Sequence, residues 1–129
     1  MKKIAVALFA LALGTGAAWA HTGHMKEAAS KKGAATTLKG EMVDMACYLG
    51  HGAHGPKHAE CAKMCVLKDG APLGVLTKAG KLYLVVQDHS DEKPYAQAKE
   101  LAGADAAVTG RVVRSGGLPA IIVDKVVKL

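Results

Sequence analysis

The sequence has few aromatic residues and lacks the short motifs that identify common enzymes. Phe, Trp and Tyr make up 4% of the 129 residues, and the single Phe and the single Trp both lie in the first 20. Because proteins bind single-stranded nucleic acid largely by stacking bases on aromatic rings, and because the basic residues are scattered, we expect no nucleic-acid partner. The sequence also contains no G-x-S-x-G, H-E-x-x-H or C-x-x-C-H pattern and no glycine-rich phosphate-binding loop. These absences favour a protein that is not an enzyme.

The longest apolar run is too short for a membrane-spanning helix. It covers residues 4–13, about half of the roughly 20 residues that a span needs. Two lysines precede the run, and an A-x-A sequence that ends at Ala20 follows it. This arrangement predicts a signal peptide over residues 1–20, cleaved between Ala20 and His21. We therefore expect a protein of the periplasm or the cell exterior, without a stable membrane anchor.

The remainder of the chain has the length of one domain. Removal of 20 residues leaves 109, enough for a modest hydrophobic core. Residues 21–36 are small and polar and predict a flexible N-terminal arm, and residues 37–129 predict the folded domain. Without the signal peptide the chain has 15 Lys and Arg against 11 Asp and Glu, a net charge of about +4 with neutral histidine.

Hydrophobic patterns and turn residues predict a mainly β domain with two helices. A glycine-containing loop is expected over residues 45–55, between the first strand and the first helix. A hairpin is expected around Lys78-Ala79-Gly80, and a second around Ser115-Gly116-Gly117. The expected strands cover residues 37–44, 72–77, 81–87, 106–114 and 118–128, and the expected helices cover residues 57–67 and 92–101 or 94–101.

This order of elements resembles the OB-fold, a five-stranded Greek-key barrel. The resemblance covers residues 37–129, and "AAVTGRVVRSGGLPAIIVDKVVKL" resembles the closing hairpin of that fold. It implies an OB-fold-like barrel with an inserted Cys/His-bearing loop and helix after strand 1, and a second helix between strands 3 and 4. OB-folds often carry binding sites on such connections, but the fold alone assigns no activity.

The cysteines are the most informative residues of the sequence. There are three, Cys47, Cys61 and Cys65, so that one disulfide at most forms within the chain and one thiol remains. On a helix, residues four apart have Cβ atoms about 5–6 Å apart, farther than the 3.5–4.5 Å of a disulfide. We therefore expect no bridge between Cys61 and Cys65 on an intact helix. One of them can bridge to Cys47, or all three can share a metal ion.

Histidines accompany the cysteines in the same segment. His58, Cys61 and Cys65 have the spacing i, i+3 and i+7, which places them within about 60° on one helical face. Thiolates with one or two imidazoles suit Zn(II) or Cu(I), so the segment predicts a copper or zinc site, in which three thiolates and His58 can complete a tetrahedral shell. The candidate ligands are Cys47, His51, His54, His58, Cys61 and Cys65.

The expected arm offers a secondary metal site. Cleavage after Ala20 would make His21 the N-terminal residue, followed closely by His24 and Met25. An N-terminal histidine can chelate Cu(II) through its amine and its imidazole. The alternative interpretation is a solvated arm without a ligand.

The cysteine segment also resembles a group of small exported bacterial proteins without an assigned activity. The resemblance rests on D-x-x-C-Y at residues 44–48, H-x-x-C-x-x-x-C at residues 58–65 and G-x-P-x-G at residues 70–74. It implies an architecture and a site, and not a reaction.

Three functions fit these observations. We expect a periplasmic, non-catalytic protein that binds copper or zinc through the Cys/His cluster. A second possibility is an OB-type module that binds a protein partner in the periplasm, with a disulfide that fixes the inserted helix to the barrel. A third is a thiol-disulfide redox protein, which requires an exposed thiolate of lowered pKa.

Overall fold

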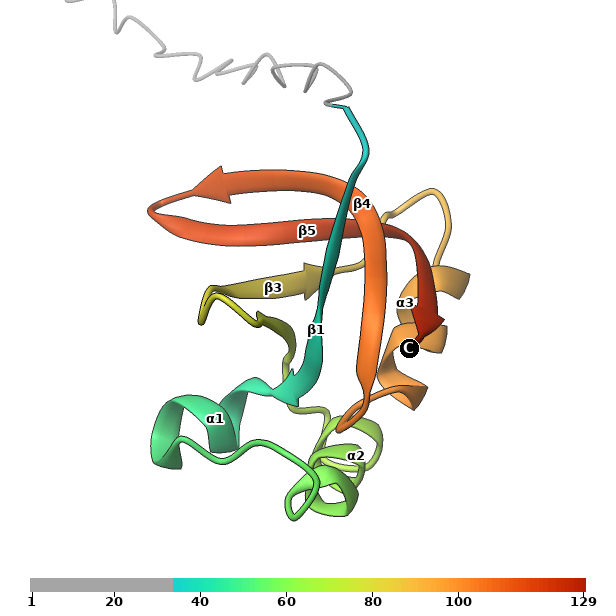
Figure 1. Cartoon of the computed structure of the whole chain (residues 1–129). Helices are drawn as coiled ribbons and strands as arrows, with labels where there is room; N and C mark the ends of the chain where they lie inside the picture. Colours follow the sequence, from blue (N-terminus) through green and yellow to red (C-terminus); the bar gives the residue numbers. More distant parts are fainter. Residues whose placement is uncertain (1–33) are drawn as a thin grey trace, which may run out of the picture.

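The computed structural model describes residues 34–129, which form a mainly β domain with three helices (Figure 1). The expected signal peptide and the candidate ligands His21, His24 and Met25 lie outside the described residues. The elements are β1 (Thr36–Asp44), α1 (Met45–His51), α2 (Ala59–Leu67), β2 (Leu73–Thr77), β3 (Leu82–Val86), α3 (Lys93–Glu100), β4 (Asp105–Ser115) and β5 (Leu118–Lys128).

The five strands form a closed barrel in the order β1-β2-β3-β5-β4, in which β4 also pairs with β1. All pairs are antiparallel except β3 with β5. The hairpin between β4 and β5 turns at Gly116 and Gly117, whose φ values of 55° and 83° suit the two-residue turn that joins twisted strands. Both expected hairpins and the helix between the third and fourth strands are therefore confirmed.

The hydrophobic core fills the barrel, and two helices close over it. Met42, Leu73, Val108 and Ile121 are fully buried inside the barrel. Val66 of α2 belongs to the same cluster, as does Ala98 of α3. The buried face of α2 thus holds this helix at one end of the barrel, and its other side faces α1 (Figure 1).

Gly40 lets β1 pair with two strands at once. This residue lies opposite Thr77 of β2 and Ala106 of β4. A Cβ atom at this position would run into the backbone carbonyl of Leu76. Only glycine permits so close a backbone approach.

The expected loop over residues 45–55 is wrong in its first half. Residues Met45–His51 form α1, which begins after Asp44 and ends at Gly52. The Asp44 side chain accepts a hydrogen bond from the Cys47 N–H, and Gly52 adopts a left-handed φ of 66°, so that both ends of this short helix are capped. α2 starts at Ala59, two residues later than expected, and β1 starts at Thr36, within the expected arm.

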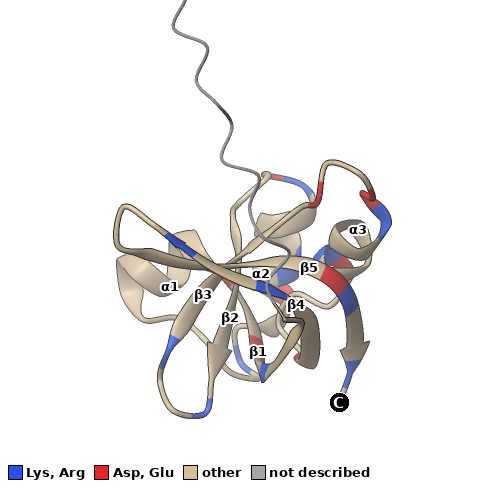
Figure 2. Ribbon diagram, turned by 90° about the horizontal axis from the view of Figure 1, so that it is seen from above, with Lys and Arg blue, Asp and Glu red and all other residues tan. Residues whose placement is uncertain are grey.

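The charged residues are scattered over the described part of the chain (Figure 2). Figure 2 shows Lys and Arg on strands, helices and loops rather than on one face in this view. In the part of the chain from residue 34 onward, no helix is long and apolar enough to cross a membrane.

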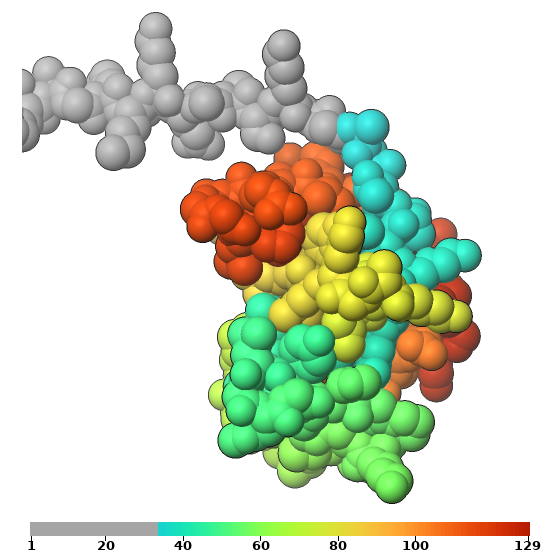
Figure 3. Space-filling model, turned by 60° about the vertical axis from the view of Figure 1, so that its left-hand side comes forward, coloured from blue at the N-terminus to red at the C-terminus, as the bar shows by residue number. Residues whose placement is uncertain are grey.

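In Figure 3 the segment of α1 and its connection to α2 forms one end of the molecule, below the hairpin between β2 and β3.

Candidate metal centre

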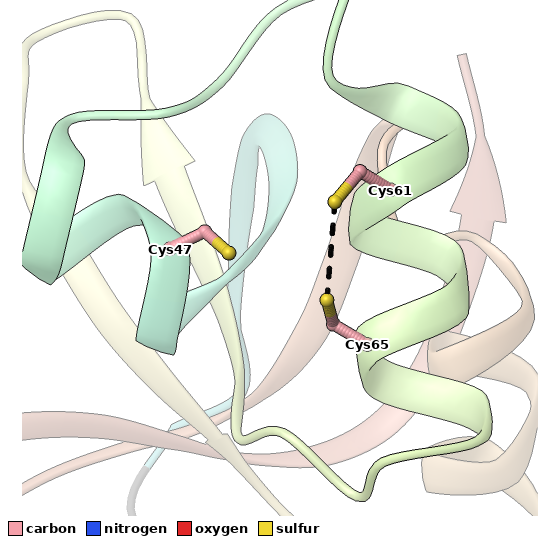
Figure 4. Close-up of side chains that lie close together, drawn as sticks. All are labelled: Cys47, Cys61 and Cys65. Carbon is pink, nitrogen blue, oxygen red and sulfur yellow. Dashed lines mark hydrogen bonds between the residues drawn. The ribbon is translucent and has the colours of Figure 1, made fainter.

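The three cysteines meet where α1 and α2 face each other (Figure 4). Cys47 extends from α1 toward α2, and Cys61 and Cys65 extend from successive turns of α2 toward α1. Their three Sγ atoms lie within 4.8 Å of one another. The fold therefore brings together the three cysteines that the sequence predicted as ligands. One comes from α1 and two come from α2.

All three cysteines are free thiols, and their exposure differs. The Sγ atoms of Cys61 and Cys65 lie 4.0 Å apart, about twice the length of a disulfide bond. Cys61 is exposed to solvent, and Cys47 and Cys65 are half-buried. The group of three thiols is therefore accessible to solvent on the side of Cys61.

Asp44 is the residue of the site that the sequence did not single out. Its side chain is fully buried, where an unpaired carboxylate would be costly. Its Oδ1 accepts a hydrogen bond from the Cys47 N–H at 3.0 Å, and its Oδ2 lies 3.2 Å from Nε2 of His58. Burial raises the pKa of Asp44, but the hydrogen bonds from Cys47, His58 and the Ala46 N–H outweigh it and leave this pKa below its ordinary value.

The same carboxylate controls the Cys47 thiol. The hydrogen bond to Asp44, followed by burial, raises the pKa of Cys47 to about 12. Burial, followed by the neighbouring Cys61, raises the pKa of Cys65 as well. Two of the three thiols are therefore held in the protonated form when no cation is bound, which is the opposite of what a redox-active thiolate requires.

Asp44, His58 and Cys47 also have the composition of a Cys-His-Asp catalytic triad. In such a triad the histidine removes the thiol proton, and the acid orients the histidine. Here the Cys47 side chain is hydrogen-bonded to Asp44 itself, and its pKa is raised rather than lowered. The arrangement does not activate Cys47 as a nucleophile.

The predicted histidine ligands have different positions. His58 precedes α2 and forms a second group with Asp44 and Cys47, whose ligand atoms lie within 4.8 Å of one another. It does not join the group of three thiols, so the expected shell of three thiolates and His58 is not formed.

His51 and His54 lie outside both groups. His51 is exposed in the last turn of α1. His54 pairs through Nδ1 with Oε2 of Glu41 at 3.4 Å, and its ring meets the edge of Tyr48 at a centroid distance of 5.9 Å. Oε1 of Glu41 accepts a hydrogen bond from the Gly55 N–H. These contacts hold the connection between α1 and α2 against β1. The role of His54 in the site is therefore structural.

Comparison of the chain with protein-family models, with curated proteins and with solved structures found no match. The geometry of the described residues therefore carries the functional inference. Two overlapping groups, one of three thiols and one of a thiol, an imidazole and a carboxylate, lie close enough together to hold a metal ion.

Proposed function

We propose that this chain is an exported, non-catalytic protein that binds copper or zinc through Cys47, Cys61 and Cys65. The mutual approach of these three thiols carries the proposal. The signal-peptide pattern and the resemblance to small exported bacterial proteins support a periplasmic location. We also propose that the barrel is of the OB type, on the grounds of its strand order and of α3 between β3 and β4.

The sulfur spacing supports metal binding. Metal–sulfur bonds of about 2.3 Å place the ligand sulfurs about 3.8 Å apart in a tetrahedral centre and about 4.0 Å apart in a trigonal one. The Sγ atoms of Cys61 and Cys65 lie 4.0 Å apart. An ion can therefore enter between them with little movement of α2, whereas a disulfide between these two residues requires the helix to distort.

The ligand set favours Cu(I) among the two metals. Soft thiolates select Cu(I), which three sulfur ligands can satisfy without a fourth. Zn(II) prefers four ligands, and the fourth position of the three-thiol group would be taken by water or by a partner at the exposed side near Cys61. We also propose a periplasmic partner protein that delivers or accepts the ion at this exposed side.

A disulfide between α1 and α2 is the second candidate arrangement, because Cys47 Sγ lies within 4.8 Å of both cysteines of α2. In this arrangement the domain would be a disulfide-stapled module that binds a protein partner. The raised pKa values of Cys47 and Cys65 count against the third possibility, a thiol-disulfide relay.

The test is a competition titration of reduced protein under anaerobic conditions with Cu(I) and, separately, Zn(II), against a chromophoric chelator. We expect binding tighter than micromolar, weakened at least tenfold by Cys47→Ser, Cys61→Ser or Cys65→Ser. His51→Gln serves as the control, because this exposed histidine lies outside both groups. Wild-type protein that binds neither ion with micromolar affinity would contradict the proposal.

A further inference from the structure

We propose a second metal position beside the first, formed by Asp44, Cys47 and His58 and occupied by Zn(II). The Cys47 thiolate would then bridge two ions, one held with Cys61 and Cys65 and the other with Asp44 and His58. The inference rests on the proposed function, because it requires Cys47 to act as a metal ligand. It changes the expected stoichiometry of the site from one ion to two.

The geometry of the second group matches a zinc shell. Zinc bonds to nitrogen and oxygen of about 2.0–2.2 Å place such ligands about 3.4 Å apart in a tetrahedron. Nε2 of His58 and Oδ2 of Asp44 lie 3.2 Å apart, and the Cys47 Sγ lies within 4.8 Å of the ligand atoms of both residues. An ion at this position would replace the proton between His58 and Asp44 and keep both side chains near their present positions. A thiolate, an imidazole and a carboxylate are all common zinc ligands.

Charge balance provides an independent argument. Three thiolates and the Asp44 carboxylate carry a charge of about −4, and Asp44 has no exposed surface. With one Zn(II) bound in the three-thiol group, the net charge of these groups and the ion is about −2. With one Cu(I) bound there instead, the net charge is about −3. Asp44 is fully buried and Cys47 and Cys65 are half-buried, so negative charge that is not compensated around Asp44 is unfavourable. A divalent ion between Asp44 and His58 brings the centre to neutrality with zinc in the first position, and to about −1 with copper.

A simpler arrangement makes a different prediction. In that arrangement His58 and Asp44 hold each other and orient Cys47 from outside the shell of a single ion, as outer hydrogen-bond partners of metal ligands often do. The loss of His58 would then weaken the one ion without changing the number of ions bound. Stoichiometry therefore separates the two arrangements.

The experiment titrates reduced protein with Zn(II) against a chromophoric chelator and compares wild type with His58→Gln and Asp44→Asn. Asparagine caps helices about as well as aspartate, so α1 should remain folded in the second variant, and circular dichroism checks this. We expect each variant to bind one Zn(II) fewer than wild type, and His51→Gln to bind the same number as wild type. Any ion held by His21 and His24 would be bound by wild type and variants alike, so it does not affect the difference in the number of ions that they bind.

Two results would overturn the second position. If wild type binds one ion, and His58→Gln and Asp44→Asn also bind one, the three-thiol site stands alone. If both variants bind as many ions as a wild type that binds two, the second ion lies elsewhere. Wild-type protein that binds no ion would instead contradict the proposed function itself.

Discussion

Replacement of Asp44 by alanine should destabilise the domain through two separate interactions. The variant loses the cap of α1, in which Oδ1 accepts the Cys47 N–H at 3.0 Å, and such a loss costs about 1 kcal/mol. It also loses the contact with His58 at 3.2 Å, a hydrogen bond to a charged group that contributes about 1.5–3 kcal/mol. Because contributions within one network are not strictly additive, we expect a loss of about 2–4 kcal/mol. This is a large part of the roughly 5–15 kcal/mol of a typical domain.

Urea unfolding of the metal-free, reduced protein measures this difference. Asp44→Asn keeps the cap and loses only the charge, so it should cost about 1–2 kcal/mol and lie between wild type and Asp44→Ala. Asp69→Ala is the control, because Asp69 is exposed and surface substitutions usually change stability by less than about 0.5 kcal/mol. An Asp44→Ala variant within 0.5 kcal/mol of wild type would refute the account of Asp44 as the residue that joins α1 to α2.

Three further predictions concern the barrel and the thiols. Gly40→Ala should cost about 3 kcal/mol in urea unfolding, because its Cβ meets backbone that cannot move, whereas Gly50→Ala in the exposed turn of α1 has free space and should be neutral or up to about 1 kcal/mol stabilising. Hydrogen bonds from Ser90, and then Arg111, lower the pKa of Asp88 to about 2, so its stabilisation is complete above about pH 4 and is lost as the pH falls through 2. Asp88→Asn should therefore be less stable than wild type at pH 6, and most of this difference should be lost by pH 2. Equal stability of the two proteins at pH 6 would contradict this. Mild peroxide treatment of metal-free protein should join Cys47 to a cysteine of α2, as mapped by mass spectrometry, and bound metal should suppress the reaction.

Much of the barrel could be predicted because its signals are local. The turn glycines at residues 116 and 117 mark the last hairpin, and alternation along β1 places Met42 in the core. Residue spacing on one helix was also sufficient to place Cys61 and Cys65 on the same face.

The remaining part of the site depends on tertiary contacts. α1 has seven residues, too few to show a helical period, and the glycines at residues 50 and 52 favoured a loop. The sequence signals that indicate it are the cap at Asp44 and the stop at Gly52. Asp44 is buried in contact with His58, which is fourteen residues away, and no local pattern predicts that contact.

X-ray absorption at the metal edge tests the central claim most directly. Reduced protein is loaded with one equivalent of Cu(I), and the spectrum reports the type, number and distance of the atoms bound to the ion. The proposed centre predicts about three sulfur ligands at about 2.3 Å, and fewer sulfur ligands in Cys65→Ser. A shell of nitrogen and oxygen alone, or the same spectrum for wild type and Cys65→Ser, would contradict a metal centre formed by Cys47, Cys61 and Cys65.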